Sequence, residues 1–176
     1  MRKLKSAELN RLSTAQFKET SKMPVAVVLD NVRSAMNVGA VFRTSDAFLI
    51  EKIYLVGITA TPPNRDIQKS ALGATETVEW EYRATIQECI ESLKRADYTI
   101  LCVEQSDRSG LLHEFTVDRQ KKYALIFGNE VDGVSQYAMD HCHYCLEIPQ
   151  FGMKHSLNIS VSAGMVIWEF ARKLRL

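Results

Sequence analysis

The sequence lacks the motifs that mark several common classes of enzyme. Glycine occurs eight times and proline four times in 176 residues, and no Gly-x-Gly-x-x-Gly, Gly-x-x-x-x-Gly-Lys-Ser/Thr or Gly-x-Ser-x-Gly pattern is present. These absences argue against a dinucleotide-binding Rossmann enzyme, a P-loop nucleotidase and an esterase. No apolar run is long enough to cross a bilayer, and the basic start is not followed by the apolar stretch of a secretory signal. We therefore expect a cytosolic protein.

Cysteine is also scarce, with four residues at positions 89, 102, 142 and 145. The segment Cys142-His143-Tyr144-Cys145, which follows His141, has the spacing of half a zinc site. A structural zinc site needs four ligands, usually from two such pairs, and the second pair is missing. We expect no metal site, and thiols buried in the core of a protein from a reducing compartment.

The charge is nearly balanced but unevenly distributed. The formal net charge of +1 is not that of a strongly basic nucleic-acid binder. The first 22 residues hold six basic side chains against two acidic ones, which leaves a net charge of −3 for the remainder. The six are Arg2, Lys3, Lys5, Arg11, Lys18 and Lys22. A basic arm can attract phosphates, and a solvated leading helix is equally consistent with the pattern. We expect residues 1–23 to form this arm or helix and residues 24–176 to form a single domain.

Apolar runs alternate with helical patterns along the chain. The runs typical of strands are Val25–Leu29, Ile53–Val56, Thr77–Tyr82, Tyr98–Val103, Tyr123–Phe127 and Tyr144–Ile148. Three segments have helical spacing. The first contains Val38, Val41, Phe42 and Phe48, and the last contains Leu157, Val161, Met165, Trp168 and Ala171. The second contains Ile86, Cys89, Ile90 and Leu93, and Thr85 and Glu88 form a predicted capping box at its start. This alternation predicts an α/β fold, a mostly parallel sheet with helices on both faces.

The last helical segment also contains a cluster of small residues. Ser160, Ser162, Ala163 and Gly164 precede a run that is mostly large and apolar. Because this run covers more than one face of a helix, we expect the helix either to be buried centrally or to be shared with a second subunit.

Polar residues gather after three of the predicted strands, where open α/β sheets place their ligands. The three groups are Asn31, Asn37, Gly39 and Arg43; then Gly128, Asn129, Glu130 and Gly133; then Pro149, Gly152, Ser156 and Asn158. Gly39 lies four residues before Arg43, so we expect it to leave space beside the guanidinium. The alternative for Arg43 is a surface ion pair with Asp46. An arginine, a glutamate, amides and a helix start together suit a ligand with phosphate and hydroxyl groups.

Taken together, these groups resemble the three ordered motifs of the SpoU (TrmH-like) RNA 2′-O-ribose methyltransferases of the SPOUT superfamily. The motifs read Asn31-x5-Asn37-x-Gly39-x3-Arg43, Phe127-Gly128-Asn129-Glu130-x2-Gly133 and Ile148-Pro149-x2-Gly152-x3-Ser156-Leu157-Asn158-x-Ser160-Val161. The segment Lys69–Ala74 is similar to a further family stretch. The resemblance covers roughly residues 24–172.

The resemblance implies a trefoil knot at the C-terminal end of the sheet, a homodimer and S-adenosylmethionine as cofactor. It implies cofactor contacts at Gly128, Ile148, Gln150 and Leu157. It further implies Arg43 as the catalytic arginine, supported by Asn37, Glu130, Ser156 and Asn158. His155 precedes this last group and is a candidate for contact with RNA.

The resulting hypothesis is a methyltransferase that uses S-adenosylmethionine to modify a ribose 2′-hydroxyl of tRNA or rRNA. A catalytically silent RNA-binding protein of the same fold is one alternative. An unrelated α/β nucleotide-binding enzyme is another, although the missing glycine motifs disfavour it.

Overall fold

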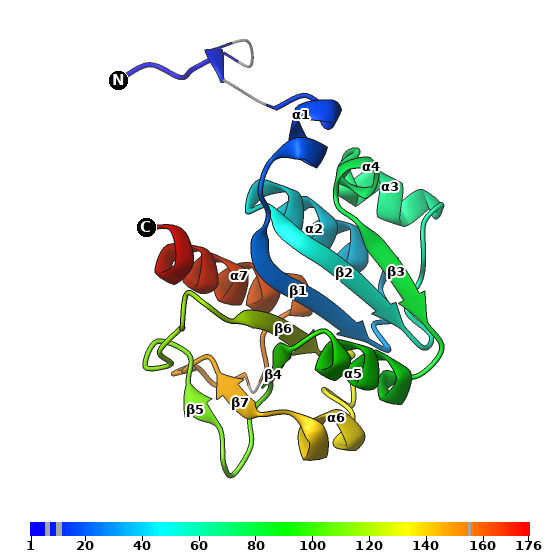
Figure 1. The fold of residues 1–176 in the computed structure, drawn as a ribbon, viewed down its shortest axis with the longest axis vertical. Helices are drawn as coiled ribbons and strands as arrows, with labels where there is room; N and C mark the ends of the chain where they lie inside the picture. The colour runs from blue at the N-terminus through cyan, green and yellow to red at the C-terminus, as the bar shows by residue number, and fades with distance from the viewer. Residues whose placement is uncertain (6–7, 10–11, 155) are drawn as a thin grey trace.

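The computed structural model describes residues 1–5, 8–9, 12–154 and 156–176, and within them the chain forms a seven-stranded sheet (Figure 1). The strand order is β3-β2-β1-β6-β4-β7-β5, and all neighbouring strands are parallel. The strands are β1 (Met23–Asp30), β2 (Ile50–Val56), β3 (Trp80–Arg83), β4 (Tyr98–Val103), β5 (Gly110–Leu111), β6 (Lys122–Phe127) and β7 (Tyr144–Glu147). The predicted parallel α/β sheet is therefore confirmed.

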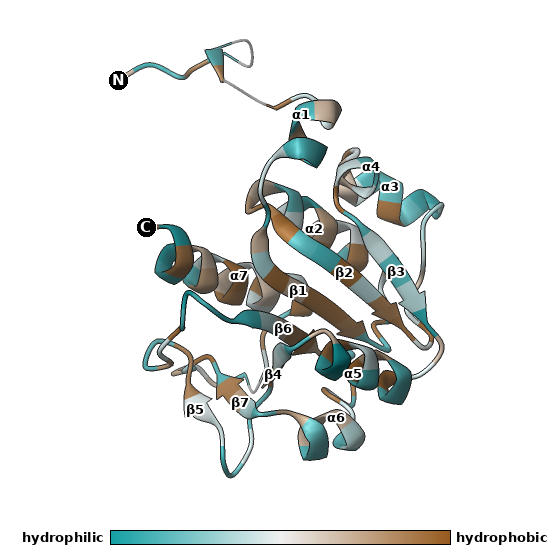
Figure 2. Cartoon of the chain, in the orientation of Figure 1, coloured by the Kyte–Doolittle hydropathy of each residue, from teal (hydrophilic) through white to brown (hydrophobic). Residues whose placement is uncertain are grey.

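Helices cover both faces of the sheet, as the alternation of elements predicted. On one face lie α2 (Ala35–Ala47), α3 (Arg65–Ala71), α4 (Ala74–Thr77) and α7 (Ile159–Arg175); on the other lie α5 (Ile86–Arg95) and α6 (Gln136–His141) (Figure 1). The central strands are apolar on both sides, which Figure 2 shows as a brown band through β1, β2 and β6. In β1, Val25 and Val27 belong to the first core, and Ala26 and Val28 belong to the second. Burial of both strand faces explains the unbroken apolar runs.

The predicted strand at Thr77–Tyr82 is only partly right. Thr77 ends the short helix α4, and β3 does not begin until Trp80. The backbone adopts left-handed values at Leu72 (φ 50°) and Gly73 (φ 90°), and this reversal starts a new helical turn that the apolar pattern alone does not reveal. The structure also adds β5 and the short helices α3 and α6, which the sequence patterns did not predict.

Helix starts differ in detail from the predictions. Thr85 accepts a hydrogen bond from the Glu88 backbone N–H (3.3 Å), but among the described residues the Glu88 side chain makes no reciprocal bond, so half of the predicted capping box forms. The last helix begins at Ile159 with Asn158 as its N-cap. Leu157 and Ser156 therefore precede the helix and lie in the loop that leads to it.

Helix α7 has one buried side and one exposed side. Ala163, Val166, Ile167 and Phe170 are buried in the core. Val161, Met165 and Trp168 are 48%, 45% and 46% exposed. The helix packs beside α2, and the rings of Phe48 and Trp168 lie 5.8 Å apart. In this chain α7 is therefore a surface helix with an apolar outer side, not a central one.

The cysteines follow the prediction in part. Cys89 and Cys102 are buried, whereas Cys142 and Cys145 are half-buried, and all four are free thiols. Within the described ranges no three His, Cys, Asp or Glu side chains are grouped to hold a metal ion. His143 instead accepts a hydrogen bond at Nδ1 from the Ile100 backbone N–H at 2.9 Å.

The N-terminal segment contacts the domain through α1 (Thr14–Glu19), which lies against α4 and whose Phe17 is buried in the first core. Arg175 at the end of α7 donates to the Ser21 carbonyl at 2.9 Å. Arg11 of the predicted basic arm and His155 lie outside the described residues. No helix in the described part of the chain is both long and apolar enough to span a membrane.

Candidate active site

Glu130 joins two segments that are far apart in the sequence. It lies in the turn after β6, and its carboxylate accepts hydrogen bonds from the backbone N–H groups of Arg33 and Ser34, both at 3.1 Å. It also accepts from the side-chain amide of Asn37 at 2.9 Å. Burial alone raises the pKa of Glu130, but the hydrogen bonds from Asn37, Arg33 and Ser34 outweigh it and lower the pKa below its ordinary value. Glu130 is thus held as a carboxylate at the start of α2.

Asn158 extends this arrangement to the third motif. Its side-chain oxygen accepts from the Ser160 backbone N–H at 2.9 Å and caps α7. Its side-chain nitrogen donates to the Asn37 side-chain oxygen at 3.2 Å. Asn158, Asn37 and Glu130 therefore form one hydrogen-bonded chain, here named the amide–carboxylate network. The structure brings together three of the five predicted catalytic residues, one from each motif.

Arg43 stands apart from the amide–carboxylate network. It is exposed on α2, about 9 Å further along the helix axis than Asn37. Among the described residues it makes no hydrogen bond or ion pair, and the alternative pair with Asp46 is not formed. Asp46 instead accepts from the Thr77 hydroxyl at 2.5 Å.

The expectation for Gly39 is wrong. Gly39 is buried, and a Cβ at this position would lie 2.0 Å from the Ser70 Oγ and 2.4 Å from the Ile67 carbonyl oxygen of α3. The missing side chain lets α3 approach α2 and does not leave space beside Arg43. Ser70 belongs to the family stretch at residues 69–74, so the two similar segments meet in space.

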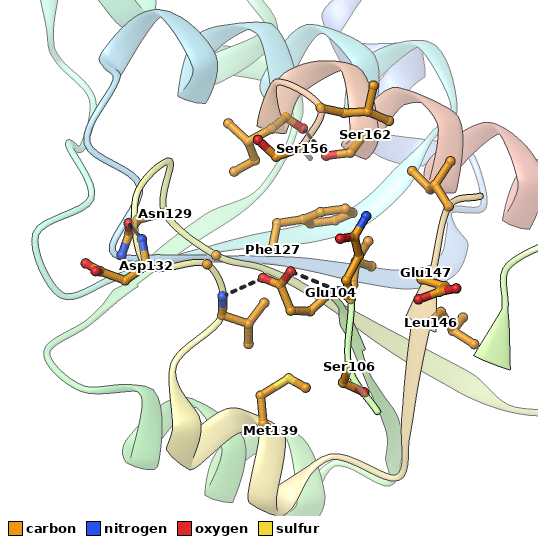
Figure 3. Close-up of a pocket in the computed structure, with 18 of the residues that line it drawn as sticks. Glu104, Ser106, Phe127, Asn129, Asp132, Met139, Leu146, Glu147, Ser156 and Ser162 are labelled. Carbon is orange, nitrogen blue, oxygen red and sulfur yellow. Dashed lines mark hydrogen bonds between the residues drawn. The ribbon is translucent and has the colours of Figure 1, made fainter. Parts of the chain in front are cut away.

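A cavity of about 590 Å³ opens at the carboxyl ends of β4, β6 and β7 (Figure 3). All four predicted cofactor residues, Gly128, Ile148, Gln150 and Leu157, line it, together with Ser156 and Glu130. Ser156 is exposed and makes no hydrogen bond among the described residues. Asn37, Asn158 and Arg43 are not among the lining residues, so the cavity and the amide–carboxylate network are neighbouring parts of one edge of the sheet.

The turn after β6 closes on itself at the rim of the cavity. The backbones of Asn129 and Gly133 exchange two hydrogen bonds, at 3.1 and 3.2 Å. The Asn129 side chain accepts from the N–H groups of Val131 (2.8 Å) and Asp132 (2.7 Å). A Cβ on Gly128 would lie 1.9 Å from the Gly133 carbonyl carbon, so this closure requires glycine at position 128.

Sequence reasoning missed four acidic residues of the cavity, Glu104, Asp107, Asp132 and Glu147. Glu104 directly follows β4 and Glu147 ends β7. The rule that selected polar residues after the other strands would have found Glu104 as well, because β4 ends at the same edge of the parallel sheet.

The cavity wall is strongly acidic. Carboxylates line it from several elements, and they are Glu104, Asp107, Glu130, Asp132 and Glu147. No Lys, Arg or His is among the described residues that line it. Such a wall favours a ligand with positive charge and disfavours a nucleotide phosphate.

Comparison with known proteins identifies the family of the chain. Residues 24–168 match the SpoU rRNA methylase family. The chain belongs to this family. The resemblance of its three motifs to SpoU proteins is thereby confirmed.

Curated SpoU relatives are longer than this chain. The chain is 33% identical over 153 residues to the 23S rRNA (guanosine-2′-O-)-methyltransferase RlmB of Neisseria meningitidis, an alignment that covers 87% of this chain and 60% of the relative. It is 30% identical over 155 residues to the RlmB of Xylella fastidiosa, with 85% and 59% covered.

Solved structures share the fold. An AdoMet-bound rRNA methyltransferase from Sinorhizobium meliloti superposes with a TM-score of 0.80 at 25% identity, covering 90% of this chain and 60% of that one. The TrmH/SpoU tRNA modifying enzyme of A. aeolicus gives a TM-score of 0.79 at 26% identity, with 91% and 81% covered.

Proposed function

We propose that the protein is an S-adenosylmethionine-dependent RNA methyltransferase that modifies a ribose 2′-hydroxyl of tRNA or rRNA. The observation that carries the proposal is the cavity, lined by all four predicted cofactor residues beside the amide–carboxylate network. Membership of the SpoU family and the guanosine-2′-O specificity in the names of two relatives support it.

The cavity fits the proposed cofactor in charge. S-adenosylmethionine carries a sulfonium and an ammonium against one carboxylate, so its net charge is positive and matches the acidic wall. Backbone groups at Gly128 and Ile148 and the Gln150 side chain would hold it, while Leu157 supplies apolar contact. When bound, the cofactor supplies an electrophilic methyl group.

Arg43 is proposed to act as a cation. Deprotonating an arginine with a pKa above about 12 at pH 7 requires roughly 7 kcal/mol, which makes it a poor base. The guanidinium has no partner among the residues that the structure describes, so it can instead bind an RNA phosphate and stabilise negative charge that develops on the ribose 2′-oxygen. The phosphate itself can assist removal of the proton.

The amide–carboxylate network is proposed to position the ribose site. Glu130 holds three N–H donors and has a lowered pKa, so it serves as a fixed acceptor and not as a general base. Through Asn37 and Asn158 it links the starts of α2 and α7. Ser156, which makes no hydrogen bond in the described part of the chain and lies two residues before Asn158, is available to hydrogen-bond a ribose or phosphate oxygen.

We further propose a homodimer formed through the α2–α7 face, defined by Met36, Arg43, Val161, Met165 and Trp168. The apolar members are each between 44% and 48% exposed. The two helices pack side by side on the same face of the sheet, so their outer sides form a continuous surface. A second copy would bury these side chains and confine Arg43 near the interface. The trefoil knot, the RNA-binding role of the N-terminal arm, the division near residue 23 and the cytosolic setting remain predictions.

Methyl transfer tests the proposed activity. Protein incubated with tritiated S-adenosylmethionine and bulk RNA should incorporate label, and mapping of 2′-O-methyl sites in RNA from cells with and without the gene should show a lost site. Label at a base atom would contradict the ribose target. Cofactor binding without incorporation into any RNA would favour the silent RNA-binding alternative.

Light scattering on dilution tests the dimer. Met165→Glu should give monomers and abolish methyl transfer, because a buried carboxylate without a partner opposes association. The matched control is Ile58→Glu, which alters an exposed apolar residue outside the α2–α7 face and should leave the dimer intact. A monomeric wild type with full activity would refute this assembly.

A further inference from the structure

Glu104 lies at the floor of the cavity, between the two motifs that form its walls. It follows β4, which pairs with β6 on one side and β7 on the other. Its backbone N–H donates to the Leu146 carbonyl at 3.1 Å, and its carbonyl accepts from the Cys145 thiol at 3.4 Å. Figure 3 shows its side chain directed into the space between Phe127 and Ser106. Two residues of β7 therefore fix its backbone in position.

The carboxylate of Glu104 accepts hydrogen bonds from two backbone N–H groups. Oε2 accepts from the Val134 backbone N–H at 3.1 Å, and Oε1 accepts from the Gln105 backbone N–H at 2.9 Å. A Cβ on Gly133 would lie 2.2 Å from Oε2, so the carboxylate is pressed against the turn after β6. No ion pair to Glu104 exists within the described ranges. Each oxygen has capacity for a further contact.

The other carboxylates of the cavity have different partners. Glu130 is engaged by the start of α2. Asp132 lies 3.8 Å from the Arg33 guanidinium, and Asp107 is 88% exposed at the rim and 3.8 Å from Arg108. Glu147 accepts the Ser109 hydroxyl at 2.6 Å, on the side toward the edge strand β5. Glu104 has two backbone N–H groups as its partners in the described chain and, unlike Asp107 and Asp132, no arginine beside it.

We propose that Glu104 is the residue by which the cavity selects the charged methyl donor over the spent, neutral product. This inference rests on the proposed cofactor. Methyl transfer removes the sulfonium charge, so S-adenosylhomocysteine has one positive charge fewer than S-adenosylmethionine. A partly desolvated carboxylate attracts the donor by this additional charge and leaves the product without it. Glu104 therefore favours exchange of product for donor after each turnover.

Calorimetry with both ligands tests this selection, using Glu104→Gln and the control Glu91→Gln, a change at an exposed position of α5 outside the cavity. The glutamine keeps an oxygen that can accept from Val134 and removes the charge. We expect the wild type to bind S-adenosylmethionine more tightly than S-adenosylhomocysteine. In Glu104→Gln the affinity for the donor should fall about five- to tenfold and that for the product less than about twofold. An analogue with an amine in place of the sulfonium should follow the donor. Glu91→Gln makes the same charge change at an exposed position that does not line the cavity, so its effect on either ligand should stay below about twofold.

Each outcome has a distinct meaning. An equal loss of affinity for both ligands would mean that Glu104 only supports the turn, and it would overturn the proposed selection. The selection would also be overturned if Glu104→Gln lost no affinity for either ligand, or if the wild type bound S-adenosylhomocysteine more tightly. Failure of the wild type to bind either ligand would refute the proposed cofactor instead. Thermal unfolding without ligand checks that Glu104→Gln folds. If it does not fold, the wild type tests the proposal instead. The ratio of its affinities for S-adenosylmethionine and S-adenosylhomocysteine is then measured at increasing salt concentrations. A ratio that falls toward one supports charge selection, and a constant ratio overturns it.

Discussion

The side chains of the amide–carboxylate network have hydrogen-bond partners, whereas two other predicted site residues have none among the described residues. In Glu130, Asn37 and Asn158, the polar atoms that face one another are paired within the chain. Arg43 and Ser156 make no hydrogen bond among the described residues. Paired groups hold structure, whereas unpaired groups are available to a ligand. Changes to the first set should therefore reduce stability together with activity, and changes to the second should reduce binding or catalysis alone.

The largest effect is expected for Arg43→Lys. The substitution keeps the charge but removes the planar fork, so the rate of methyl transfer should fall about 100-fold. Thermal stability and affinity for the cofactor should stay near those of the wild type, because Arg43 contacts neither the network nor the cavity in the described residues. Single-turnover kinetics and calorimetry measure the two quantities. Near-normal turnover in the lysine variant would rule out a specific role for the guanidinium.

Glu130→Gln should affect both properties. The amide can no longer accept all three hydrogen bonds, so the free energy of unfolding should fall by about 1 kcal/mol and the rate of methyl transfer by about tenfold or more. Urea denaturation and methyl-transfer assays report the two losses. A rate loss with unchanged stability would place Glu130 in the chemistry and break the distinction drawn above.

Asn158→Ala and Ser156→Ala form a matched pair two residues apart. The first removes the N-cap of α7 and the link to Asn37, which should lower the free energy of unfolding by about 1 kcal/mol. The second removes a hydroxyl without a partner in the described chain and should change stability by less than about 0.5 kcal/mol. Denaturation curves compare them directly. Equal destabilisation by both would mean that Ser156 belongs to the network.

The smallest expected effect is on the pH dependence of stability. The pKa of Glu130 is lowered in the folded protein, so its contribution is fully present above the unfolded value of about 4.3 and is lost as the pH falls through the folded value. Unfolding measured at pH 7 and at acid pH should show a smaller decrease in Glu130→Gln than in the wild type. Parallel curves for the two proteins would show that Glu130 titrates normally.

The sequence predicted the parts of the fold that depend on burial. The runs at Tyr98–Val103 and Tyr123–Phe127 match β4 and β6 closely, because strands buried on both faces must be apolar throughout. Helix α4 was missed because it begins with a left-handed backbone reversal at Leu72 and Gly73, which local apolarity does not record. Strand β5 was also missed, because a strand of two residues is too short to produce an apolar pattern.

The sequence predicted which residues form the site but not which of them contact one another. The motifs contained every member of the amide–carboxylate network, yet the bond from Asn158 to Asn37 joins residues 121 positions apart. Gly39 was assigned to the wrong neighbour, since the approach of α3 depends on tertiary packing. Glu104 followed the strand-end rule and was overlooked because no family motif includes it.

The turn at residues 129–133 has a consequence for the length of the chain. Surface loops commonly accept insertions, because their ends are free to adjust. Here the two backbone bonds between Asn129 and Gly133 fix the number of residues, and the contact between Gly128 and Gly133 leaves no room for a wider ring. One additional residue would move Glu130 away from α2 and Val134 away from Glu104 at the same time. Proteins that share this site should therefore vary in length elsewhere and keep this turn at constant length.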